Sequence, residues 1–333
     1  MMIETVVFDI DGTLTDRNSG QVPVSVKHAV KQLKAQKMLI LIATGRPFFE
    51  VDRHLIEMVE PDAIICNNGQ RIVDRDGYVF HETPIDPEIL KKALRYIEEK
   101  GWDCAMHMAD HTLVLKGESI QQTIARVTHK KPILKRARSV TVETSSFNIM
   151  VHASPAEINE FIANFPELKA EAFDDGYFDI YPIGVDKADG ISYVLEKKRK
   201  RWTSLMAFGD AENDVRMLKK AYYGVAMEDG DPMLKQIKGI HTSPAAKDDG
   251  IFKTLLKFGF VEFPDDRKDY ARFKHRFITT SLRYVLPISF FLYIAVVYDA
   301  MRGALNSQSF INGILGTILL VYAIHLYIKP RNG

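Results

Sequence analysis

Apolar runs alternate with segments of helical spacing over residues 3–69. Runs rich in β-branched residues at 5–8, 38–43 and 63–66 are typical of buried strands. Between these runs, apolar residues recur at helical spacing, as at Val26, Val30 and Leu33. This alternation of strands and helices predicts a parallel sheet with right-handed crossovers.

The pattern changes between residues 78 and 182, where short strand candidates mix with helical segments. Alternation of helix and strand resumes from about residue 190 and continues to residue 226. We therefore expect an α/β fold, in which a Rossmann-like, doubly wound parallel sheet is interrupted by an inserted α+β cap domain. The expected boundaries are 1–80 for the first part of the core, 81–183 for the cap and 184–263 for the second part of the core.

Composition and charge narrow the classes of protein. The chain has 333 residues, of which 46% are hydrophobic and 26% charged, so it can form domains with large cores. A formal net charge of +1 gives no reason to expect a nucleic-acid partner. Two cysteines, Cys66 and Cys104, provide no disulfide framework, which favours a reducing, cytoplasmic location for the catalytic portion.

Polar clusters follow four of the predicted strands. Asp9 and Asp11 follow the first strand, and similar clusters occupy residues 43–46, 67–69 and 209–214. In an open parallel sheet, ligands bind beyond the carboxyl ends of the strands. An EF-hand loop does not fit, because Gly12 comes too early and no suitably spaced Glu follows. The sequence therefore predicts one polar site at this edge of the sheet.

The motifs FDIDGT, ATGR, GVDKADGI and GDAENDVRML, in this order, resemble the four motifs of the haloacid dehalogenase superfamily of phosphohydrolases. The long insertion between CNNGQ and FDIYPIGVDK is similar to the α/β cap of the Cof-type branch. The resemblance covers residues 3 to about 260. It implies a phosphoric monoester hydrolase that acts through an aspartyl-phosphate intermediate.

The resemblance also implies roles for individual residues. Asp9 is expected to be the nucleophile, and Asp11 the group that protonates the leaving oxygen and then activates water. Thr44 and the backbone N–H of Gly45 would hold the transferring phosphoryl oxygens, and Lys187 would supply positive charge to them.

A phosphate and several carboxylates need a cation, and oxygen ligands favour Mg²⁺. The expected metal ligands are Asp9, the backbone carbonyl of Asp11, and Asp210, with Asp214 beside them. The residues around 210–214 also fit a helix N-terminus carrying favourable acids.

Three further residues are expected to contact the substrate, namely Arg46, Asn68 and Asn213. Arg46 fits a phosphate contact and a surface ion pair equally well. Turn chemistry explains Asn68 nearly as well as a substrate contact does. In the cap, Trp102, His107, His111 and Tyr181 are candidates for substrate selection, although single aromatic residues and histidines in such a domain more often serve packing.

The carboxyl-terminal part has a different pattern. Residues 284–301 and 310–328 are each apolar and long enough to cross a hydrocarbon core of ~30 Å. We expect a two-helix transmembrane hairpin at 284–330, preceded by a basic juxtamembrane linker at 264–283. A soluble hairpin packed on the phosphatase or in a homodimer is the alternative. Residues 265–333 contain nine Lys and Arg residues and four Asp residues. The basic residues lie mostly outside the hairpin loop, which predicts a multi-pass membrane protein with both termini cytoplasmic.

Together these observations predict a membrane-anchored, Mg²⁺-dependent phosphatase. Its expected substrate is a sugar phosphate, a nucleotide or a similar small phosphorylated metabolite, or a lipid-linked phosphate, and its other partners are the lipid bilayer and a membrane protein. Two alternatives remain open at this point. One is a membrane regulatory or binding protein that uses the same fold, and the other is a phosphotransferase or mutase of the same superfamily.

Overall fold

The structure is a computed structural model, which describes residues 2–127, 134–136 and 145–263. The chain divides into two compact units, Met1–Val261 and Glu262–Gly333, and the described helices and strands lie in the first. The expected linker at 264–283 and the expected hairpin at 284–330 lie outside the described residues. Within the described ranges, no helix is long and apolar enough to cross a membrane.

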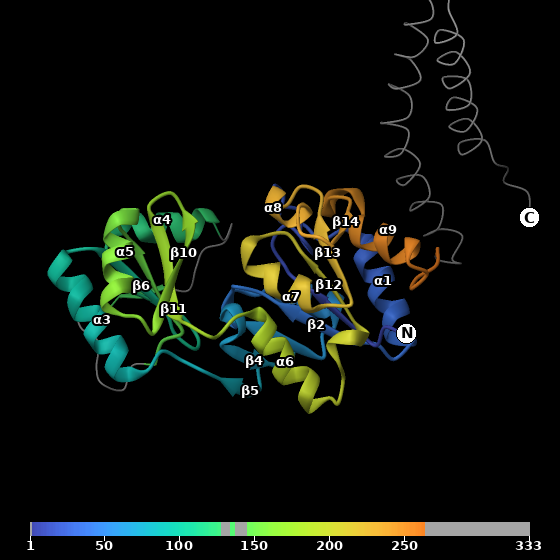
Figure 1. The fold of residues 1–333 in the computed structure, drawn as a ribbon, viewed down its shortest axis with the longest axis horizontal. Coiled ribbons are helices and arrows are strands. Elements are labelled where there is room, and N and C mark those ends of the chain that lie inside the picture. Colours follow the sequence, from blue (N-terminus) through green and yellow to red (C-terminus); the bar gives the residue numbers. More distant parts are fainter. Residues whose placement is uncertain (1, 128–133, 137–144, 264–333) are drawn as a thin grey trace, which may run out of the picture. The chain divides into compact units, whose positions relative to one another are not determined.

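The core is an eight-stranded sheet with the order β14-β13-β12-β1-β2-β3-β4-β5 (Figure 1). Its first six strands are parallel, and the sequence pattern predicts all of them except β14, which lies beyond residue 226. The side chains of β1 and β3 are fully buried because helices cover both faces. The parallel strands are β1 (Thr5–Phe8), β2 (Leu39–Ala43), β3 (Ala63–Cys66), β12 (Leu205–Gly209), β13 (Tyr223–Met227) and β14 (His241–Ser243).

Two antiparallel strands extend this sheet beyond the predicted parallel core. They are β4 (Arg71–Val73) and β5 (Val79–Glu82), joined by a short turn. Neither was predicted, because β4 has only three residues and β5 is mostly exposed, so neither carries a hydrophobic run.

Helices form two layers on the core sheet. The first includes α1 (Val24–Ala35), α2 (Arg53–Val59) and α9 (Gly250–Lys257), with α1 contacting the other two. The second includes α6 (Lys187–Lys197), α7 (Val215–Lys220) and α8 (Pro232–Lys235), whose apolar residues share a cluster with one face of the sheet. Short 3₁₀ segments are η1 (Phe48–Glu50), η2 (Asn67–Gly69), η3 (Trp202–Ser204), η4 (Glu212–Asp214) and η5 (Ala246–Asp248).

Helix α6 approaches the sheet unusually closely. A Cβ atom at Gly190 would lie 2.4 Å from Ile65 Cγ2, so a larger residue would push the helix away from β3. Asp186 begins the helix with a capping box, in which its carboxylate accepts from the N–H of Asp189. These two features fix the first turn of α6, which carries Lys187, against the carboxyl end of the sheet.

The inserted domain is built on a second, six-stranded sheet with the order β10-β11-β9-β6-β7-β8 (Figure 1). Helices α3 (Pro87–Lys100) and α5 (Pro155–Asn164) pack on one face, and α4 (Glu118–Val127) packs on part of the other. The strands are β6 (Asp103–His107), β7 (Thr112–Lys116), β8 (Leu134–Arg136), β9 (Asn148–His152), β10 (Leu168–Asp174) and β11 (Tyr177–Pro182).

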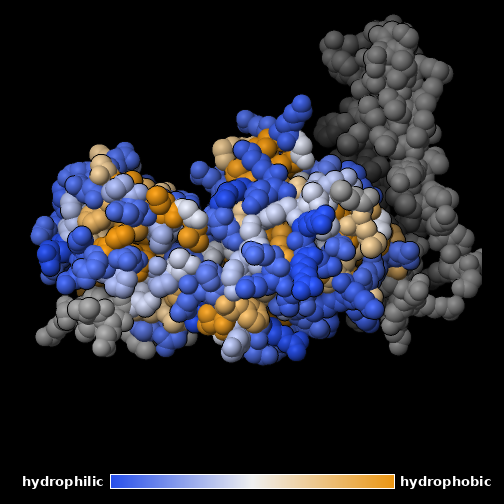
Figure 2. Space-filling view, turned by 60° about the horizontal axis from the view of Figure 1, so that its bottom comes forward, coloured by the Kyte–Doolittle hydropathy of each residue, from blue (hydrophilic) through white to orange (hydrophobic). Residues whose placement is uncertain are grey.

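The described surface is largely hydrophilic, with hydrophobic residues gathered in separate patches (Figure 2). We refer below to the inserted domain as the cap, defined as β6–β11 with α3, α4 and α5.

Candidate active site

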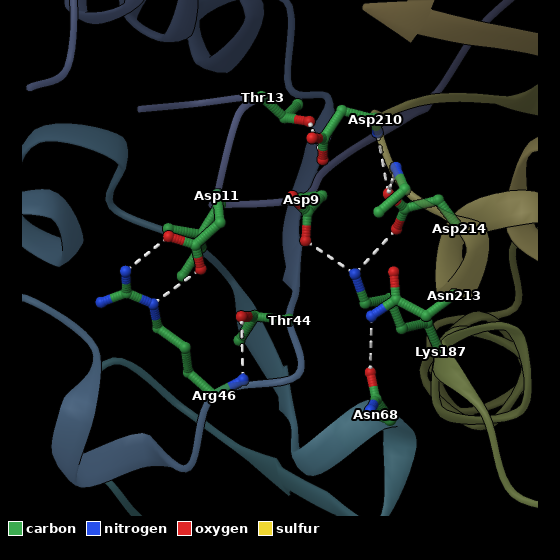
Figure 3. Close-up of polar contacts among 12 residues, drawn as sticks. Asp9, Asp11, Thr13, Thr44, Arg46, Asn68, Lys187, Asp210, Asn213 and Asp214 are labelled. Atoms are coloured by element: carbon green, nitrogen blue, oxygen red, sulfur yellow. Dashed lines mark hydrogen bonds and ion pairs between the residues drawn. The ribbon is translucent and has the colours of Figure 1, made fainter. Parts of the chain in front are cut away.

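The polar clusters predicted from the sequence meet at the carboxyl edge of the core sheet (Figure 3). Asp9 and Asp11 follow β1, Thr44 and Arg46 follow β2, and Asn68 lies in η2 after β3. Asp210 follows β12, and Asn213 and Asp214 lie in η4. Because parallel strands end at the same edge, residues far apart in the sequence become neighbours here.

A buried lysine links two of these carboxylates. Lys187 Nζ donates to Asp9 Oδ1 and to Asp214 Oδ1, each at 2.7 Å. The side chains of Lys187, Asp9 and Asp214 are only 2%, 6% and 0% exposed. A buried cation is tolerated only when it is paired in this way, so Lys187 is fixed by the two carboxylates and in turn orients Asp9.

One lysine does not neutralise the carboxylates at this edge. One oxygen each of Asp9, Asp210 and Asp214 lies within 4.8 Å of the others. Burial raises the pKa of Asp9 well above its usual value; Lys187 opposes this, and Asp214 and Asp210 add to it. Burial and then Asp214 raise the pKa of Asp210 to about 6, although Arg17 and Lys187 act against them. The cluster therefore favours an additional cation.

The chemistry of these side chains fits Mg²⁺, which prefers hard oxygen ligands and binds through one or two carboxylates. Asp9 and Asp210 are the two best placed to hold it. Arg17 and Thr13 contact the Asp210 carboxylate, but Arg17 is 51% exposed and can turn toward solvent. The partners of Asp214 are fixed, because its Oδ1 accepts from buried Lys187 and its Oδ2 accepts from the N–H of Asp210 at 2.8 Å and of Ala211 at 3.1 Å. Asp214 therefore shapes the loop after β12 and positions Lys187.

Asp11 lies apart from the three clustered carboxylates, and its side chain turns toward Arg46 (Figure 3). Arg46 binds it through two parallel contacts, one of them from Nε to Asp11 Oδ2 at 2.7 Å. Asp11 is 56% exposed and Arg46 only 15%. Arg46 thus forms an ion pair, as one of the two sequence interpretations proposed, but its partner is an exposed acid of the predicted site.

A turn separates the two aspartates. Gly12 has φ of +79°, which favours glycine, and a Cβ atom there would lie 2.3 Å from Asp210 Oδ2. Only glycine therefore allows the chain to leave β1, pass beside Asp210 and turn the side chain of Asp11 away from that of Asp9.

The remaining predicted residues lie around the same edge. Thr44 is buried, and its Oγ1 accepts from the backbone N–H of Arg46 at 3.1 Å. Gly45 packs against Asn68, since a Cβ atom there would lie 3.2 Å from Asn68 Oδ1. Asn213 Nδ2 donates to that same oxygen at 3.0 Å, so the third and fourth predicted clusters are joined. Asn68 has φ of +51°, which agrees with a turn role as well.

The structure adds two residues that the sequence did not single out. Arg17 pairs with Asp210 Oδ2, and Thr13 Oγ1 donates to Asp210 Oδ1 at 3.4 Å. Arg17 follows the first motif in a stretch with no hydrophobic period, so nothing in the pattern places it near a residue almost two hundred positions away.

The four cap candidates have different surroundings. Trp102 is buried in the cluster that includes α3 and α5, and His111 Nδ1 lies 2.6 Å from Asp110 Oδ1. Both therefore have a structural explanation. His107 and Tyr181 are also buried, on strands β6 and β11.

Comparisons with known proteins show the family of this chain. The haloacid dehalogenase-like hydrolase family matches residues 6–255. The "Putative phosphatase YkrA" of Bacillus subtilis is 28% identical over 265 residues, covering 77% of this chain and 98% of the relative. An "HMP-PP phosphatase" of Enterobacter is 27% identical, covering 70% of this chain and 87% of the relative.

A crystal structure of a phosphatase of the same superfamily from Bacteroides thetaiotaomicron is 26% identical, with a TM-score of 0.69 over 78% of this chain and 96% of that one. The family match spans the core on both sides of the cap, and the expectation of an enzyme rather than a binding protein is confirmed. This chain belongs to the haloacid dehalogenase-like hydrolases and is a hydrolase of phosphate monoesters.

Proposed function

We propose that the protein is a Mg²⁺-dependent phosphatase that transfers the phosphoryl group of a small metabolite to Asp9 and then to water. The observation that carries this proposal is the buried lysine bridge. Lys187 holds Asp9 Oδ1 at 2.7 Å, which fixes a carboxylate at the edge where the loops of four strands converge. A carboxylate fixed in this way can attack phosphorus and form an aspartyl-phosphate, which divides hydrolysis into two easier displacements.

Asp11 is the proposed acid and base. The leaving oxygen takes a proton from Asp11 in the first step, and water gives a proton to it in the second. Arg46 contacts both oxygens of Asp11, whereas the first step needs one of them to face the leaving oxygen. Arg46 therefore has to leave Asp11 before the leaving group departs, and the oxygens of the incoming phosphate offer it an alternative partner.

Thr44 and the backbone N–H of Gly45 are the proposed donors to the transferring phosphoryl oxygens, and Asn68 with Asn213 borders the same space. Bound Mg²⁺, held by Asp9, Asp210 and the backbone carbonyl of Asp11 with Asp214 beside them, would supply positive charge to those oxygens. The donor set supports this assignment because all its members are hard oxygen ligands and three are buried carboxylates.

The test is phosphate release by the purified protein from a panel of sugar phosphates, nucleotides, lipid phosphates and p-nitrophenyl phosphate, with Mg²⁺ and with EDTA. We expect turnover that requires Mg²⁺ and disappears in Asp9→Asn. Turnover that persists in Asp9→Asn would refute the aspartyl-phosphate route. Release of phosphate to an added alcohol in place of water would instead favour a phosphotransferase.

We also propose that residues 284–330 anchor the enzyme to a membrane with its catalytic part in the cytoplasm. Two apolar segments, 284–301 and 310–328, support this, as do the basic residues on both sides of the pair. A substrate or partner at the membrane surface would follow from such an anchor. The full-length protein should stay in the membrane fraction after a carbonate wash, because apolar burial is not screened by salt.

A chain that ends at Phe263 should be released and remain active, since every proposed catalytic residue precedes that point. The relative from Bacillus subtilis that is 28% identical aligns over 98% of its own length with 77% of this chain. This supports a catalytic part that does not need the remaining residues of this chain. Release of the full-length protein by salt alone would refute the anchor without affecting the catalytic assignment.

A further inference from the structure

Basic residues lie along the edge of the core sheet that is opposite the active site. Parallel strands begin at one edge and end at the other, so the segments that enter these strands share the amino edge. With the last described residues, they contain twelve Lys and Arg residues against five Asp and Glu residues. We call this surface the basic edge, and it consists of residues 2–4, 34–38, 59–62, 196–204, 219–222, 235–240 and 257–263.

Helix ends explain part of this charge. Helices α1, α6, α7, α8 and α9 each carry a lysine in the last turn, where a cation is favourable because the last carbonyl groups are unpaired. The turn after α6 has no such explanation. Lys198, Arg199 and Arg201 are exposed there, and none of them pairs with an acid among the described residues, whereas Lys200 pairs with Glu4 at 3.3 Å. Adjacent like charges repel one another, so this turn favours an anionic partner.

Aromatic side chains lie among these cations. Trp202 is half-buried in η3, and Lys220 Nζ lies 4.7 Å from the centre of its ring. Tyr222 is 46% exposed, and its ring packs against that of Tyr223 with 4.7 Å between centroids. Tyrosine and tryptophan combine an apolar ring with a polar tip, which suits the boundary between water and lipid. Cations mixed with aromatic rings are typical of surfaces that lie on anionic membranes.

The described part of the chain also ends at the basic edge. Gln36 lies in the segment that enters β2, and its Nε2 donates to the backbone carbonyl of Phe260 at 2.7 Å. The ring of Phe258 packs against that of Tyr223, the first residue of β13, at 4.7 Å between centroids. These two contacts fix the point where the chain leaves the core.

The residues that follow favour a membrane as the partner of this surface. The apolar segment 284–301 begins about 20 residues after the described chain ends, and a tether this short gives the basic edge a high effective concentration beside any bilayer that the segment enters. The tether is basic as well, so it and the edge match the same negatively charged lipid surface. A nucleic acid would match the cations, but no feature of the chain brings it to this edge.

We propose that the basic edge lies on the anionic lipid surface of the membrane that anchors the chain, so that the active site faces away from the membrane. This inference rests on the anchor under the proposed function and adds the surface that meets the lipid.

The orientation also restricts the substrate. Strand β12 has five residues, which at about 3.3 Å each separate the two edges of the sheet by about 17 Å. A phosphate on a lipid of the same bilayer, as in phosphatidic acid, therefore lies too far from Asp9 to react. The substrate of an enzyme held in this way is a soluble phosphate monoester.

The test places the full chain in vesicles of phosphatidylcholine, with or without about 30% phosphatidylserine. Both kinds contain a lipid with a spin label on its headgroup, which quenches tryptophan fluorescence at the membrane surface. Trp102, the other of the two tryptophans, is 6% exposed in the cap core, so Trp202 is the one that reports contact. We expect quenching in the anionic vesicles at low salt and its loss in about 1 M NaCl, where charges are screened beyond ~3 Å. Trp202→Phe should remove the quenched signal.

Charge removal at the turn after α6 identifies the contact. In the triple variant Lys198→Gln, Arg199→Gln and Arg201→Gln, the equilibrium constant for surface contact, taken from the quenched fraction, should fall by about a hundredfold. Each cation near an anionic surface contributes about fivefold to binding, and three are removed.

A matched control removes the same charge elsewhere. Lys91→Gln, Lys92→Gln and Arg95→Gln change three exposed cations on α3 of the cap, and this variant should keep the quenching of the parent protein. Both triple variants should hydrolyse p-nitrophenyl phosphate as fast as the parent protein, because none of the six residues lies at the carboxyl edge that holds Asp9.

The outcomes separate this inference from the proposals on which it rests. Release of the full chain by the carbonate wash would refute the anchor and this inference with it, while the phosphatase would remain. If the chain stays in the membrane and Trp202 is quenched equally without phosphatidylserine, or equally in the triple variant of the turn, the anchor stands and the inference is wrong. Binding of transfer RNA in place of anionic vesicles would overturn the choice of partner. Hydrolysis of phosphatidic acid in the bilayer that holds the protein would overturn the orientation.

Discussion

Replacing Lys187 with methionine is the strongest single test of how the active site is held together. The change keeps the length of the side chain and removes its charge. Lys187 Nζ contacts Asp9 and Asp214 at 2.7 Å each, and all three side chains are at most 6% exposed. After the change, water cannot supply the lost positive charge. The buried carboxylates of Asp9 and Asp214 then lack their cation and lie within 4.8 Å of Asp210.

The expected loss of unfolding free energy is about 3–5 kcal/mol, the range found when one partner of a buried ion pair is removed. This is a large part of the ~5–15 kcal/mol that stabilises a typical domain. The loss should be greatest at pH 8 and smaller at pH 5. Burial already raises the pKa of Asp9 and of Asp210, and without Lys187 both carboxylates take up protons more readily as the pH falls.

The measurement is urea unfolding in EDTA at both pH values, with 1 M NaCl in a parallel series. Lys100→Met is the control, because Lys100 pairs with Glu160 at 3.0 Å on the surface and should contribute little. A loss in Lys187→Met below ~1 kcal/mol, or one that 1 M NaCl abolishes, would refute the view that buried, unscreened charge pairing holds the site.

Three further predictions concern the same edge of the sheet. Asp9→Asn should abolish phosphate release yet leave thermal stability equal or higher, since ionised Asp9 is unfavourable where it is buried; a large loss of stability would contradict this. Asp11→Asn should reduce turnover by about 10²–10⁴-fold for alkyl phosphates and less for p-nitrophenyl phosphate, whose leaving oxygen needs no proton, and equal losses would argue against an acid role. The folded-state pKa of Asp210, about 6, lies above the usual 3.8, so ionisation of Asp210 destabilises the folded protein. In EDTA, the free energy of unfolding should therefore fall by up to about 3 kcal/mol, relative to Asp210→Asn, as the pH rises from about 4 through 6. Added Mg²⁺ should reverse this loss in urea unfolding above pH 6.

The core and its site could be predicted from the sequence because both depend on regular features. Buried parallel strands give continuous apolar runs, and the predicted run at 63–66 coincides with β3, Ala63–Cys66. Parallel strands also carry their carboxyl ends to one edge, which is why Asp9 and Asp210 become neighbours. The features that the sequence did not predict have no hydrophobic periodicity. Strand β5 is one, because its side chains are mostly exposed, and Arg17 is another, because it reaches Asp210 from a loop.

The pairing of Arg46 with Asp11 could not be read from the sequence either. Both residues lie in recognisable motifs, but the contact depends on the turn at Gly12, which directs Asp11 away from Asp9. Motif spacing gives the identity of catalytic side chains and leaves their rotamers undetermined. Helix α6 is similar, because its start at Lys187 rather than at residue 190 depends on the capping box of Asp186.

The core and the cap differ in how the sequence encodes their polar residues, and this difference explains why the reaction is easier to infer than the substrate. The catalytic residues sit in contiguous loops, so each motif keeps several of them together in the chain. The polar residues of the cap sheet come one at a time from separate strands, as with His107 on β6 and Asp179 on β11, and each alternates with apolar neighbours of the cap core. Such positions look like ordinary strand residues until the strands are paired. The order of the motifs therefore indicates the reaction, whereas no comparable run of residues in the cap indicates the leaving group.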